Sequence, residues 1–357
     1  MISPPPLKSL YLYITRRCNM QCEHCWISAG PNRTENEVTY AELRRAICKA
    51  KQLGLQNVKI SGGEPFLRLQ LVKKLLKLLF QLNLKAFVES NGTLIDEDKV
   101  KLLKIYNVAS IGISLDFPDE ARFEEFRHLK GSFKRVLRTM SLLARNNIQF
   151  ESVATIVRSN IVCLPHIAEL AFGLGAKSFK INPCLTIGRA KNLGEENLTS
   201  EDYGRLVSAL LELNDKWPGR VVSMLPLPFV AQYGRKHFNL ARVGCHYKNL
   251  LGILPNGDVS LCGTGICHPE AILGNVKRDD MDDMWNSNNE FLTKLRSLEP
   301  EKFRGVCGEC MFRSNCANLC PAFVYDVYGD LQASYPICQS CYDAGFFPKK
   351  YVTSITH

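Results

Sequence analysis

Short apolar runs rich in β-branched residues recur along the first two thirds of the chain, separated by longer segments with a helical period. A run of five to nine such residues, bounded by polar or glycine-containing stretches, is typical of a buried strand. We therefore expect six strands, at Leu10–Ile14, Asn57–Ser61, Lys85–Ser90, Val108–Leu115, Gln149–Val157 and Ser178–Asn182.

Between and after these runs, apolar residues recur every three to four positions, which predicts amphipathic helices. Start signals support several of them, because Thr39 and Glu42 form a capping-box pattern, and Asp96 and Ser132 precede two others. The expected helices lie at about Tyr40–Leu53, Gln70–Leu82, Glu97–Lys104, Phe133–Asn146, Pro165–Leu174 and Glu201–Leu213.

Strict alternation of strands and helices implies a parallel sheet with right-handed crossovers. Six such units are too few for a closed eight-fold barrel. We predict an α/β fold, a partial (β/α)6 TIM barrel, with its chemistry at the carboxyl ends of the strands.

The pattern changes after Leu213. Trp217-Pro218-Gly219 and Pro226-Leu227-Pro228 interrupt any long helix. Further on, Leu250–Leu261 is typical of a hairpin whose turn is Asn256-Gly257. We expect a barrel over residues 1–215, a connecting region over 216–244 and a cysteine-rich domain over 245–357.

Composition narrows the class of protein. Hydrophobic residues make up 46% and charged residues 22% of the 357 residues, which predicts a packed core. No apolar run reaches the roughly 18 residues that span a membrane, and the N-terminus shows no export signal. We therefore expect a cytoplasmic protein without membrane contact.

Fifteen cysteines are unusual for such a protein. In a reducing cytoplasm disulfides rarely persist, and an odd count suits a closed disulfide framework poorly. Metal or cluster ligation is the main use that remains. The net charge of +10 suggests docking of an acidic peptide or an acidic electron-donor protein, while the lack of a basic-aromatic stripe argues against nucleic acid.

Three of the cysteines, Cys18, Cys22 and Cys25, directly follow the first strand with the spacing C-x3-C-x2-C. Three thiolates suit a 4Fe-4S cluster with one iron left without a protein ligand. A zinc site would need a fourth ligand. His24 is the nearest candidate, but it lies between two of the cysteines, too close to reach the same metal easily.

Polar clusters follow the next three strands. Two glycines and a carboxylate end the second strand, and the third and fourth strands end in serine, asparagine and aspartate. Each could be an ordinary turn, but all are expected on one rim with the cysteines. The clusters are Ser61-Gly62-Gly63-Glu64-Pro65, Glu89-Ser90-Asn91-Gly92-Thr93 and Ser114-Leu115-Asp116.

These motifs resemble the radical S-adenosylmethionine (SAM) superfamily over about Leu10 to Leu213. Cys18, Cys22 and Cys25 match its C-x3-C-x-φ-C signature, and Gly62-Gly63-Glu64-Pro65 match its GGEP motif. The resemblance implies a 4Fe-4S cluster whose open iron binds SAM.

The same resemblance implies a role for each motif residue. The GGEP backbone and Glu64 would receive the methionine ammonium, and Ser90, Asn91 and Ser114 would contact the ribose or methionyl part. Arg127 resembles the arginine that pairs with the SAM carboxylate, for which a bidentate guanidinium is suited. Gly188-Arg189-Ala190 resembles a loop of related enzymes, or is a plain surface turn. Reductive cleavage of SAM would give a 5′-deoxyadenosyl radical that removes a hydrogen atom from the substrate.

The last third carries a second cysteine pattern, C-x11-G-x4-C followed by C-x2-C-x5-C-x3-C and a final cysteine. Taken alone, these seven cysteines with His246 or His268 could form two zinc sites. The pattern from Cys245 to Cys338 resembles the SPASM domain, named for subtilosin, PQQ, anaerobic sulfatase and mycofactocin maturation. The resemblance implies two auxiliary 4Fe-4S clusters. Cys245, Cys262 and Cys320 would bind the first, and Cys307, Cys310, Cys316 and Cys338 the second.

The first auxiliary cluster then lacks a fourth ligand. Cys267 is our preferred candidate, Cys341 is another, and the position could also be open to a substrate thiolate. The three other cysteines, Cys48, Cys163 and Cys184, are expected to be small buried side chains.

SPASM proteins mostly modify ribosomally made peptides, which predicts a peptide maturase that forms a thioether or carbon–carbon cross-link. A sulfatase-type maturase is less favoured, because Gly263 stands where that subgroup has an aspartate after the second SPASM cysteine. A small-molecule oxidase or decarboxylase, acting for example on a tetrapyrrole, is a further alternative.

The expected partners follow from that chemistry. They are a peptide or protein substrate and an electron donor of the flavodoxin or ferredoxin type. Because the barrel pattern begins at Leu10, we expect any leader peptide to be recognised by a separate protein or by the barrel and SPASM surface.

Overall fold

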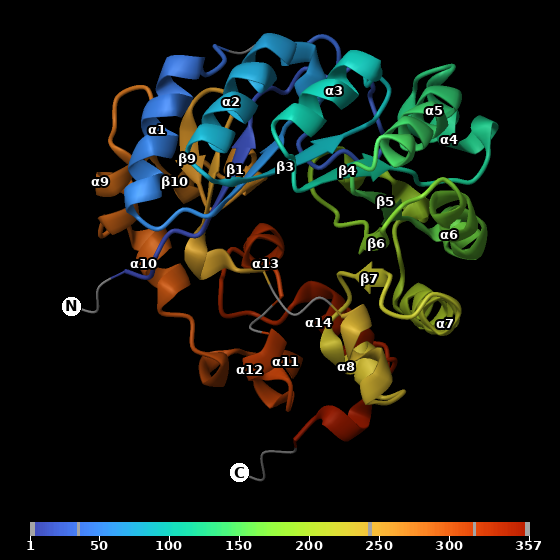
Figure 1. Cartoon of the computed structure of the whole chain (residues 1–357). Helices are drawn as coiled ribbons and strands as arrows, with labels where there is room; N and C mark the ends of the chain where they lie inside the picture. Colours follow the sequence, from blue (N-terminus) through green and yellow to red (C-terminus); the bar gives the residue numbers. More distant parts are fainter. Residues whose placement is uncertain (1–3, 34–35, 242–244, 317–318, 354–357) are drawn as a thin grey trace.

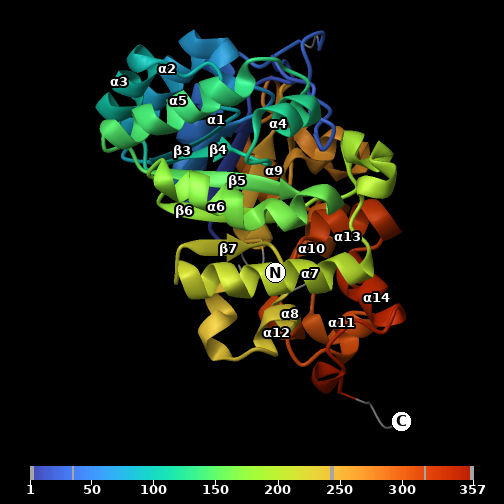
Figure 2. The same ribbon diagram turned by 90° about the vertical axis from the view of Figure 1, so that its right-hand side faces the viewer.

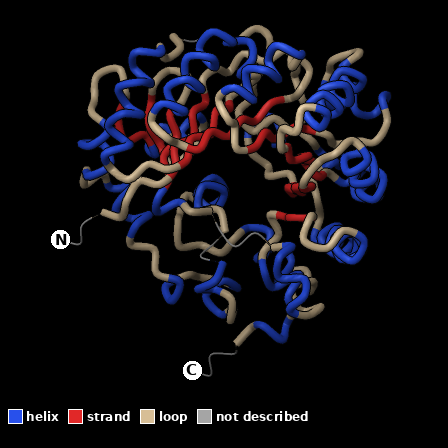
Figure 3. The backbone as a smooth tube through the Cα atoms, in the orientation of Figure 1, coloured by secondary structure: helices blue, strands red, loops and turns tan. Residues whose placement is uncertain are grey.

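One curved sheet organises the molecule. The computed structural model describes residues 4–33, 36–241, 245–316 and 319–353. Within these residues the sheet has ten strands in the order β10-β9-β8-β1-β2-β3-β4-β5-β6-β7. The strands trace an arc, and the helices of the first two thirds lie along its outer side (Figures 1 and 3).

The six expected strands are confirmed to within about two residues. All are parallel, and each pairs with its neighbour in chain order. The partial barrel predicted from the alternation is therefore present. The strands are β1 (Ser9–Tyr13), β2 (Asn57–Ser61), β3 (Lys85–Ser90), β4 (Ser110–Ser114), β5 (Phe150–Ile156) and β6 (Ser178–Pro183).

The six expected helices are also present. Thr39 and Glu42 form the expected capping box, and the Asp96 carboxylate accepts a hydrogen bond from the backbone of Lys99. The helices are α1 (Tyr40–Gln52), α2 (Leu69–Gln81), α3 (Glu97–Ile105), α5 (Ser132–Arg145), α6 (Leu164–Gly173) and α7 (Ser200–Lys216).

Two local features differ from the expectation. Ser132 does not cap α5, because it is the first helical residue and Gly131, with φ of 70°, precedes it. A further helix, α4 (Glu120–Arg127), was missed, although Asp119 caps it through the backbone of Arg122. Helix α4 matters because Arg127 is its last residue.

The connecting region is more regular than its prolines suggested. It contains β7 (Val221–Ser223), which extends the parallel sheet beside β6, and α8 (Leu227–Ala231). Residues 242–244, at its end, lie outside the described residues.

The cysteine-rich region continues the barrel sheet. Strand β8 (Leu250–Ile253) pairs in parallel with β1, and β9 (Asp258–Ser260) and β10 (Ile272–Asn275) follow in antiparallel order. The expected hairpin is thus β8–β9, with Gly257 at φ of 95° in its turn. The remaining helices are α9 (Met281–Asn286), α10 (Glu290–Arg296), α11 (Val306–Glu309), α12 (Arg313–Cys316), α13 (Pro321–Tyr328) and α14 (Pro336–Asp343).

Helices α11, α12 and α14 lie at the opposite end of the molecule from α2 and α3, whereas α9 packs beside α1 (Figures 1 and 2). One apolar cluster runs from Leu10 through Leu210 to Phe323 and Cys338, so the barrel and the C-terminal region share a core. The boundaries at 215 and 245 stay a prediction. No helix in the described part of the chain has the length and apolarity needed to cross a membrane.

The two faces of the barrel sheet differ in polarity. Along β1 and β2, Leu10, Leu12, Val58 and Ile60 are fully buried under the outer helices. The alternate positions carry polar side chains on the inner face, for example Lys59. A packed barrel would fill this face with branched apolar residues. This inner face is instead built to border a polar space.

A glycine permits the junction between the barrel and the cysteine-rich region. Gly252 of β8 lies opposite Tyr11 of β1, and a Cβ atom at Gly252 would come within 2.8 Å of the Cα of Cys262. The loop that carries Cys262 can therefore rest directly on the sheet.

We expect Gly252→Ala to destabilise the protein by about 1–3 kcal/mol, because the backbone around Cys262 must shift. The thermal unfolding midpoint measures this. Gly204→Ala is the matched control, since nothing lies within 4 Å of that exposed position in α7, and it should stabilise by about 0.5–1 kcal/mol. Equal midpoints for the two variants would contradict the tight junction.

Candidate functional site

The cysteine loop between β1 and α1 forms one wall of a cavity of about 190 Å³. Cys18 and Cys22 are buried, and Cys25 is half-buried. Most of the predicted SAM-contact residues line the same cavity, namely Gly62, Gly63, Ser90, Asn91, Ser114 and Arg127. Trp26 and Arg189 line it as well. The structure therefore brings the motifs of four strand ends together, as the sequence predicted.

Hydrogen-bond donors face the three sulfur atoms. The backbone N–H of Met20 donates to Cys18 Sγ at 3.4 Å, and that of Ala29 donates to Cys25 Sγ at 3.3 Å. Asn91 Nδ2 lies 3.7 Å from Cys18 Sγ, and Arg127 Nη1 lies 3.8 Å from Cys22 Sγ. Such donors stabilise thiolates in iron–sulfur sites.

Burial raises the pKa of the Cys18 thiol to about 12 and that of Cys22 to about 11. The free thiols therefore keep their protons at neutral pH. Iron would displace those protons on binding. The donor set and the burial together fit a three-thiolate cluster.

The glycine pair holds the cysteine loop against the second strand. Gly63 N–H donates to the carbonyl of Thr15 at 2.6 Å, and Glu64 N–H donates to that of Arg17 at 2.9 Å. A Cβ atom would lie 2.5 Å from Thr15 O at Gly62 and 2.1 Å from Arg17 O at Gly63. The glycines are thus required for backbone contact with the loop, whatever ligand the site takes.

Glu64 is fully buried behind the cavity wall. Its two carboxylate oxygens accept hydrogen bonds from Ser90 Oγ at 2.9 and 3.0 Å, and from the backbone of Asn91 and Phe66. Burial raises the pKa of Glu64 to about 7. In this structure Glu64 ties the end of β3 to the turn after β2. Pro65 begins the single turn η1 (Pro65–Arg68) that follows.

Arg127 is buried and paired with Asp116. Its Nε and Nη2 lie 2.7 and 2.5 Å from Asp116 Oδ2. Asp116 Oδ1 also accepts a hydrogen bond from the backbone of Thr155. The carboxylate after β4 therefore fixes the guanidinium on the cavity wall, beside Cys22.

The Gly188-Arg189-Ala190 segment is not a free surface turn. Arg189 N–H donates to Cys25 O at 3.1 Å, and its Nε donates to Cys22 O at 2.8 Å. A Cβ atom at Gly188 would lie 2.2 Å from Trp26 O. Arg189 Nη2 is buried without a hydrogen-bond partner and borders the cavity. This segment braces the cysteine loop from the side of β6.

The inner face carries a charged group that the sequence analysis missed. Lys59 Nζ lies 3.0 Å from Glu89 Oε1 and 3.8 Å from the centre of the Tyr11 ring. Burial would raise the pKa of Glu89, but Lys59 and Lys180 outweigh it and hold that pKa at about 2. Glu89 borders the cavity and keeps 43% of its side chain accessible. The sequence carried a signal for this pair, because Lys59 and Glu89 are charged residues at alternate positions of otherwise apolar strands.

The C-terminal cysteines separate into two groups. Cys245, Cys262 and Cys320 pack against one apolar cluster, which Cys307 of the second group also contacts. Burial, and then the charges of Cys320 and Cys262, raise the pKa of Cys245. Cys245 N–H also donates to Leu319 O at 2.9 Å, which brings the two distant segments together. Cys320 thus leaves its local run and joins Cys245 and Cys262, as the resemblance implied.

The second group, Cys307, Cys310, Cys316 and Cys338, lines one small apolar cavity. Backbone N–H groups of Tyr335 and Phe312 donate to Cys307 and Cys310 at 3.3 and 3.4 Å. Within the described residues, no group of three or more His, Cys, Asp or Glu side chains is already placed around one metal position.

The two candidate fourth ligands of the first group differ in exposure. Cys267 is exposed, and the nearby charges that affect it are Asp326, Lys191 and Arg16. Cys341 is fully buried beside Ser200. Cys163 and Cys184 are buried as expected, whereas Cys48 is half-buried on α1.

Trp26 links the two halves of the site. It directly follows Cys25, and its ring packs edge-to-face with Tyr13 at 5.7 Å. A Cβ atom at Gly263, the residue after Cys262, would lie 2.3 Å from the Trp26 ring. The loops that carry Cys25 and Cys262 therefore meet through one aromatic side chain.

Comparison with known proteins agrees with this arrangement. Residues 12–170 match the radical SAM superfamily, and residues 245–311 match an iron–sulfur cluster-binding domain, SPASM. The AdoMet-dependent heme synthase of Oleidesulfovibrio alaskensis is 25% identical over 94% of this chain and 87% of its own. The subtilosin biosynthesis protein AlbA of Bacillus subtilis is 26% identical over 88% of this chain and 67% of its own.

A solved structure has the same fold. Streptococcus suis SuiB bound to its precursor peptide SuiA superposes with a TM-score of 0.73 at 17% identity, over 94% of this chain and 76% of SuiB. At that identity the likeness establishes the fold.

We expect Gly63→Ala to displace the cysteine loop and to remove the SAM-site cluster, a loss of about four irons per chain. Iron and sulfide analysis after anaerobic reconstitution measures this. Gly173→Ala is the control, since nothing lies within 4 Å of Gly173. Full iron content in Gly63→Ala would show that the tight backbone contact is not needed for the cluster.

Proposed function

The chain carries a radical SAM domain followed by a SPASM domain, and from this premise we propose that it is a maturase of ribosomally made peptides. The reaction would remove a hydrogen atom from one residue of the peptide and form an oxidative cross-link, either a thioether or a carbon–carbon bond. The observation that carries the proposal is the polar inner face of the barrel, which lies between the SAM-site cysteines and the first C-terminal cysteine group.

Cys18, Cys22 and Cys25 would hold the cluster, with their thiolates stabilised by the donors of Met20 and Ala29. When bound, the cluster and SAM supply one-electron cleavage to a 5′-deoxyadenosyl radical. The chain's own residues orient the cofactor. The Gly62–Pro65 turn, Ser90, Asn91 and Ser114 would contact its methionyl and ribose parts.

Two charged residues of the site would bind different groups of SAM. Arg127 would meet the SAM carboxylate with a guanidinium that Asp116 already fixes. Glu64 would receive the methionine ammonium at the acceptor position that its present donors leave, since Ser90, Asn91 and Phe66 supply three protons to a carboxylate with about four lone-pair sites. Burial by the helices around the rim would exclude water from the radical.

Three 4Fe-4S clusters in total fit the thiol groups. Cys245, Cys262 and Cys320 would hold the first auxiliary cluster, and Cys307, Cys310, Cys316 and Cys338 the second. The fourth ligand of the first auxiliary cluster would be Cys267, which is exposed on the loop after Cys262, or Cys341, or the position would be open to a substrate thiolate. The auxiliary clusters would accept the electron that cross-linking releases, and an external flavodoxin- or ferredoxin-type protein would supply the electron for SAM cleavage.

Peptide substrates are supported by the two peptide-related neighbours, AlbA and the SuiB complex with SuiA. If the peptide carries a leader, a separate recognition protein would present it. The sulfatase-type alternative is disfavoured on steric grounds, because the Trp26 ring fills the position where a side chain at Gly263 would lie.

A tetrapyrrole substrate is the second candidate. The match to a heme synthase over 94% of the chain favours it. The lysines of the inner face would suit the carboxylates of such a molecule. The two candidates share the generation of the radical and differ in the substrate and in the reaction that follows, which is cross-linking of a peptide or loss of carboxyl groups from a tetrapyrrole.

The triple variant Cys18→Ala/Cys22→Ala/Cys25→Ala should produce no 5′-deoxyadenosine under reducing conditions, because the cluster that cleaves SAM is lost. Chromatography of the nucleoside products measures this. Cys48→Ala, on helix α1, should retain full activity. Unchanged 5′-deoxyadenosine formation by the triple variant would refute the assignment of the cysteines.

Co-expression with a short peptide encoded beside this protein should yield a peptide that has lost the mass of a pair of hydrogen atoms, with fragmentation blocked at the cross-link. Mass spectrometry measures both. Purified enzyme with an iron–coproporphyrin is the parallel assay. Loss of carboxyl groups from the porphyrin, with the peptide unchanged, would show that the substrate is a tetrapyrrole and would contradict the peptide proposal.

A further inference from the structure

A cationic groove lies next to the cysteine loop and is separate from the cavity of the predicted SAM-contact residues. It has a volume of about 510 Å³ and shares no lining residue with the cavity of Cys18, Ser114 and Arg127. Its lining combines Arg17, Arg68 and Lys74 with the apolar side chains of Tyr40, Leu67, Leu69 and Leu71. One end of the groove is covalently adjacent to Cys18, because Arg17 directly precedes that cysteine.

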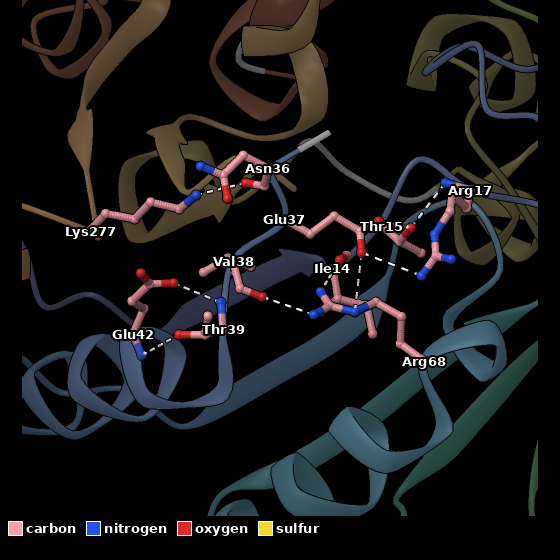
Figure 4. Close-up of polar contacts among 10 residues, drawn as sticks. All are labelled: Ile14, Thr15, Arg17, Asn36, Glu37, Val38, Thr39, Glu42, Arg68 and Lys277. Carbon is pink, nitrogen blue, oxygen red and sulfur yellow. Dashed lines mark hydrogen bonds and ion pairs between the residues drawn. The ribbon is translucent and has the colours of Figure 1, made fainter. Parts of the chain in front are cut away.

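The arginines of the groove are held in fixed positions. Arg17 Nη2 and Arg68 Nε lie 3.5 and 3.3 Å from Glu37 Oε2, and Thr15 Oγ1 donates to the other oxygen of Glu37. Arg68 also donates to the carbonyls of Ile14 and Val38, at 2.7 and 3.1 Å. Figure 4 shows both guanidinium groups directed at this one carboxylate. The positive charge is therefore preorganised and tied to the backbone of β1.

Lys74 adds a mobile charge at the other end of the groove. Its Nζ lies 5.6 Å from the centre of the Tyr40 ring, and the side chain is exposed on α2. Leu67 lines the same groove and is 41% exposed. Among the described lining residues, three cations thus share the groove with an exposed apolar side chain, and Glu37, which pairs with Arg17 and Arg68, is only 14% exposed.

We propose that this groove docks an acidic one-electron carrier protein that reduces the SAM-site cluster. The inference rests on the proposed function, since that function needs an electron at this cluster. The carrier would give up one electron, and the cluster would gain it across the Arg17–Cys18 segment. Charge complementarity identifies the partner: a negatively charged surface is steered toward the cations, and Leu67 supplies the apolar contact at the centre.

Electron-transfer complexes are small and short-lived, which a groove of this size permits. A surface next to the cluster also shortens the path of the electron. Because the groove shares no lining residue with the cavity of the predicted SAM-contact residues, the donor could bind while that cavity is occupied.

The test compares two electron sources. Lys74→Glu/Leu67→Asp should lower the rate of SAM cleavage driven by reduced flavodoxin about tenfold, since steering is lost. The rate driven by dithionite should stay unchanged, because that small reductant needs no docking surface. Flavodoxin-driven cleavage by the wild type should also fall as salt rises.

Lys101→Glu is the matched control, as an exposed lysine on α3 that lies outside the groove. The variants change exposed side chains only, and equal thermal midpoints would show that they fold. Binding of oxidised flavodoxin, followed by fluorescence anisotropy, should weaken about tenfold in the double variant and not in Lys101→Glu.

Equal flavodoxin-driven rates and equal binding in wild type and double variant would overturn the proposal. Loss of substrate modification with dithionite as the reductant would overturn it too, because the groove would then serve the substrate. If dithionite gave no SAM cleavage even in the wild type, the proposed function would fail, and the anisotropy measurement would still decide whether the groove binds the carrier.

Discussion

The cysteine loop is held in place by backbone contacts that leave no room for a side chain. Gly62 and Gly63 press against Thr15 and Arg17, and two backbone hydrogen bonds close the contact. From the opposite side, Arg189 bonds the carbonyls of Cys22 and Cys25. The three thiols therefore sit in a frame made by β1, β2 and the segment after β6. Every other feature of the site is positioned relative to this frame.

The frame depends in turn on the unequal faces of the sheet. The outer face is apolar and packs under helices, which supplies the burial that stabilises the fold. The inner face is then free to carry charged groups such as Lys59 and Glu89. Partly buried charges of this kind cost free energy unless they are paired. Their presence on the inner face is consistent with a space adapted to a polar ligand.

The aromatic contact between Trp26 and Gly263 connects the two cysteine systems. It explains why glycine follows Cys262, since any larger residue would collide with the indole ring. The aspartate that sulfatase-type maturases carry after the second SPASM cysteine would therefore collide with Trp26 if it stood at position 263. The same contact brings the SAM-site loop and the first C-terminal thiol group to the same region of the barrel.

Much of the architecture followed from the sequence alone. Periodicity predicted the six strands and six helices, because each buries one face and so repeats its apolar residues. The C-x3-C-x2-C spacing predicted that Cys18, Cys22 and Cys25 lie together, since they belong to one short loop. The grouping of the C-terminal cysteines was implied by the resemblance to the SPASM domain and not by spacing, because Cys320 lies with Cys245 and Cys262 rather than with its neighbours in sequence. The helix α4 was missed, because its eight residues show only a short apolar stripe around Phe123.

Tertiary structure decided what spacing could not. The pairing of β8 with β1 joins residues some 240 positions apart, and no local pattern announces it. The partners of Arg127, Arg189 and Lys59 also lie on distant elements. The exposure of Cys267 depends on the path of a loop rather than on its distance from Cys262 along the chain. The sequence determined which chemical groups the chain carries, and packing of the sheet decided which of them meet.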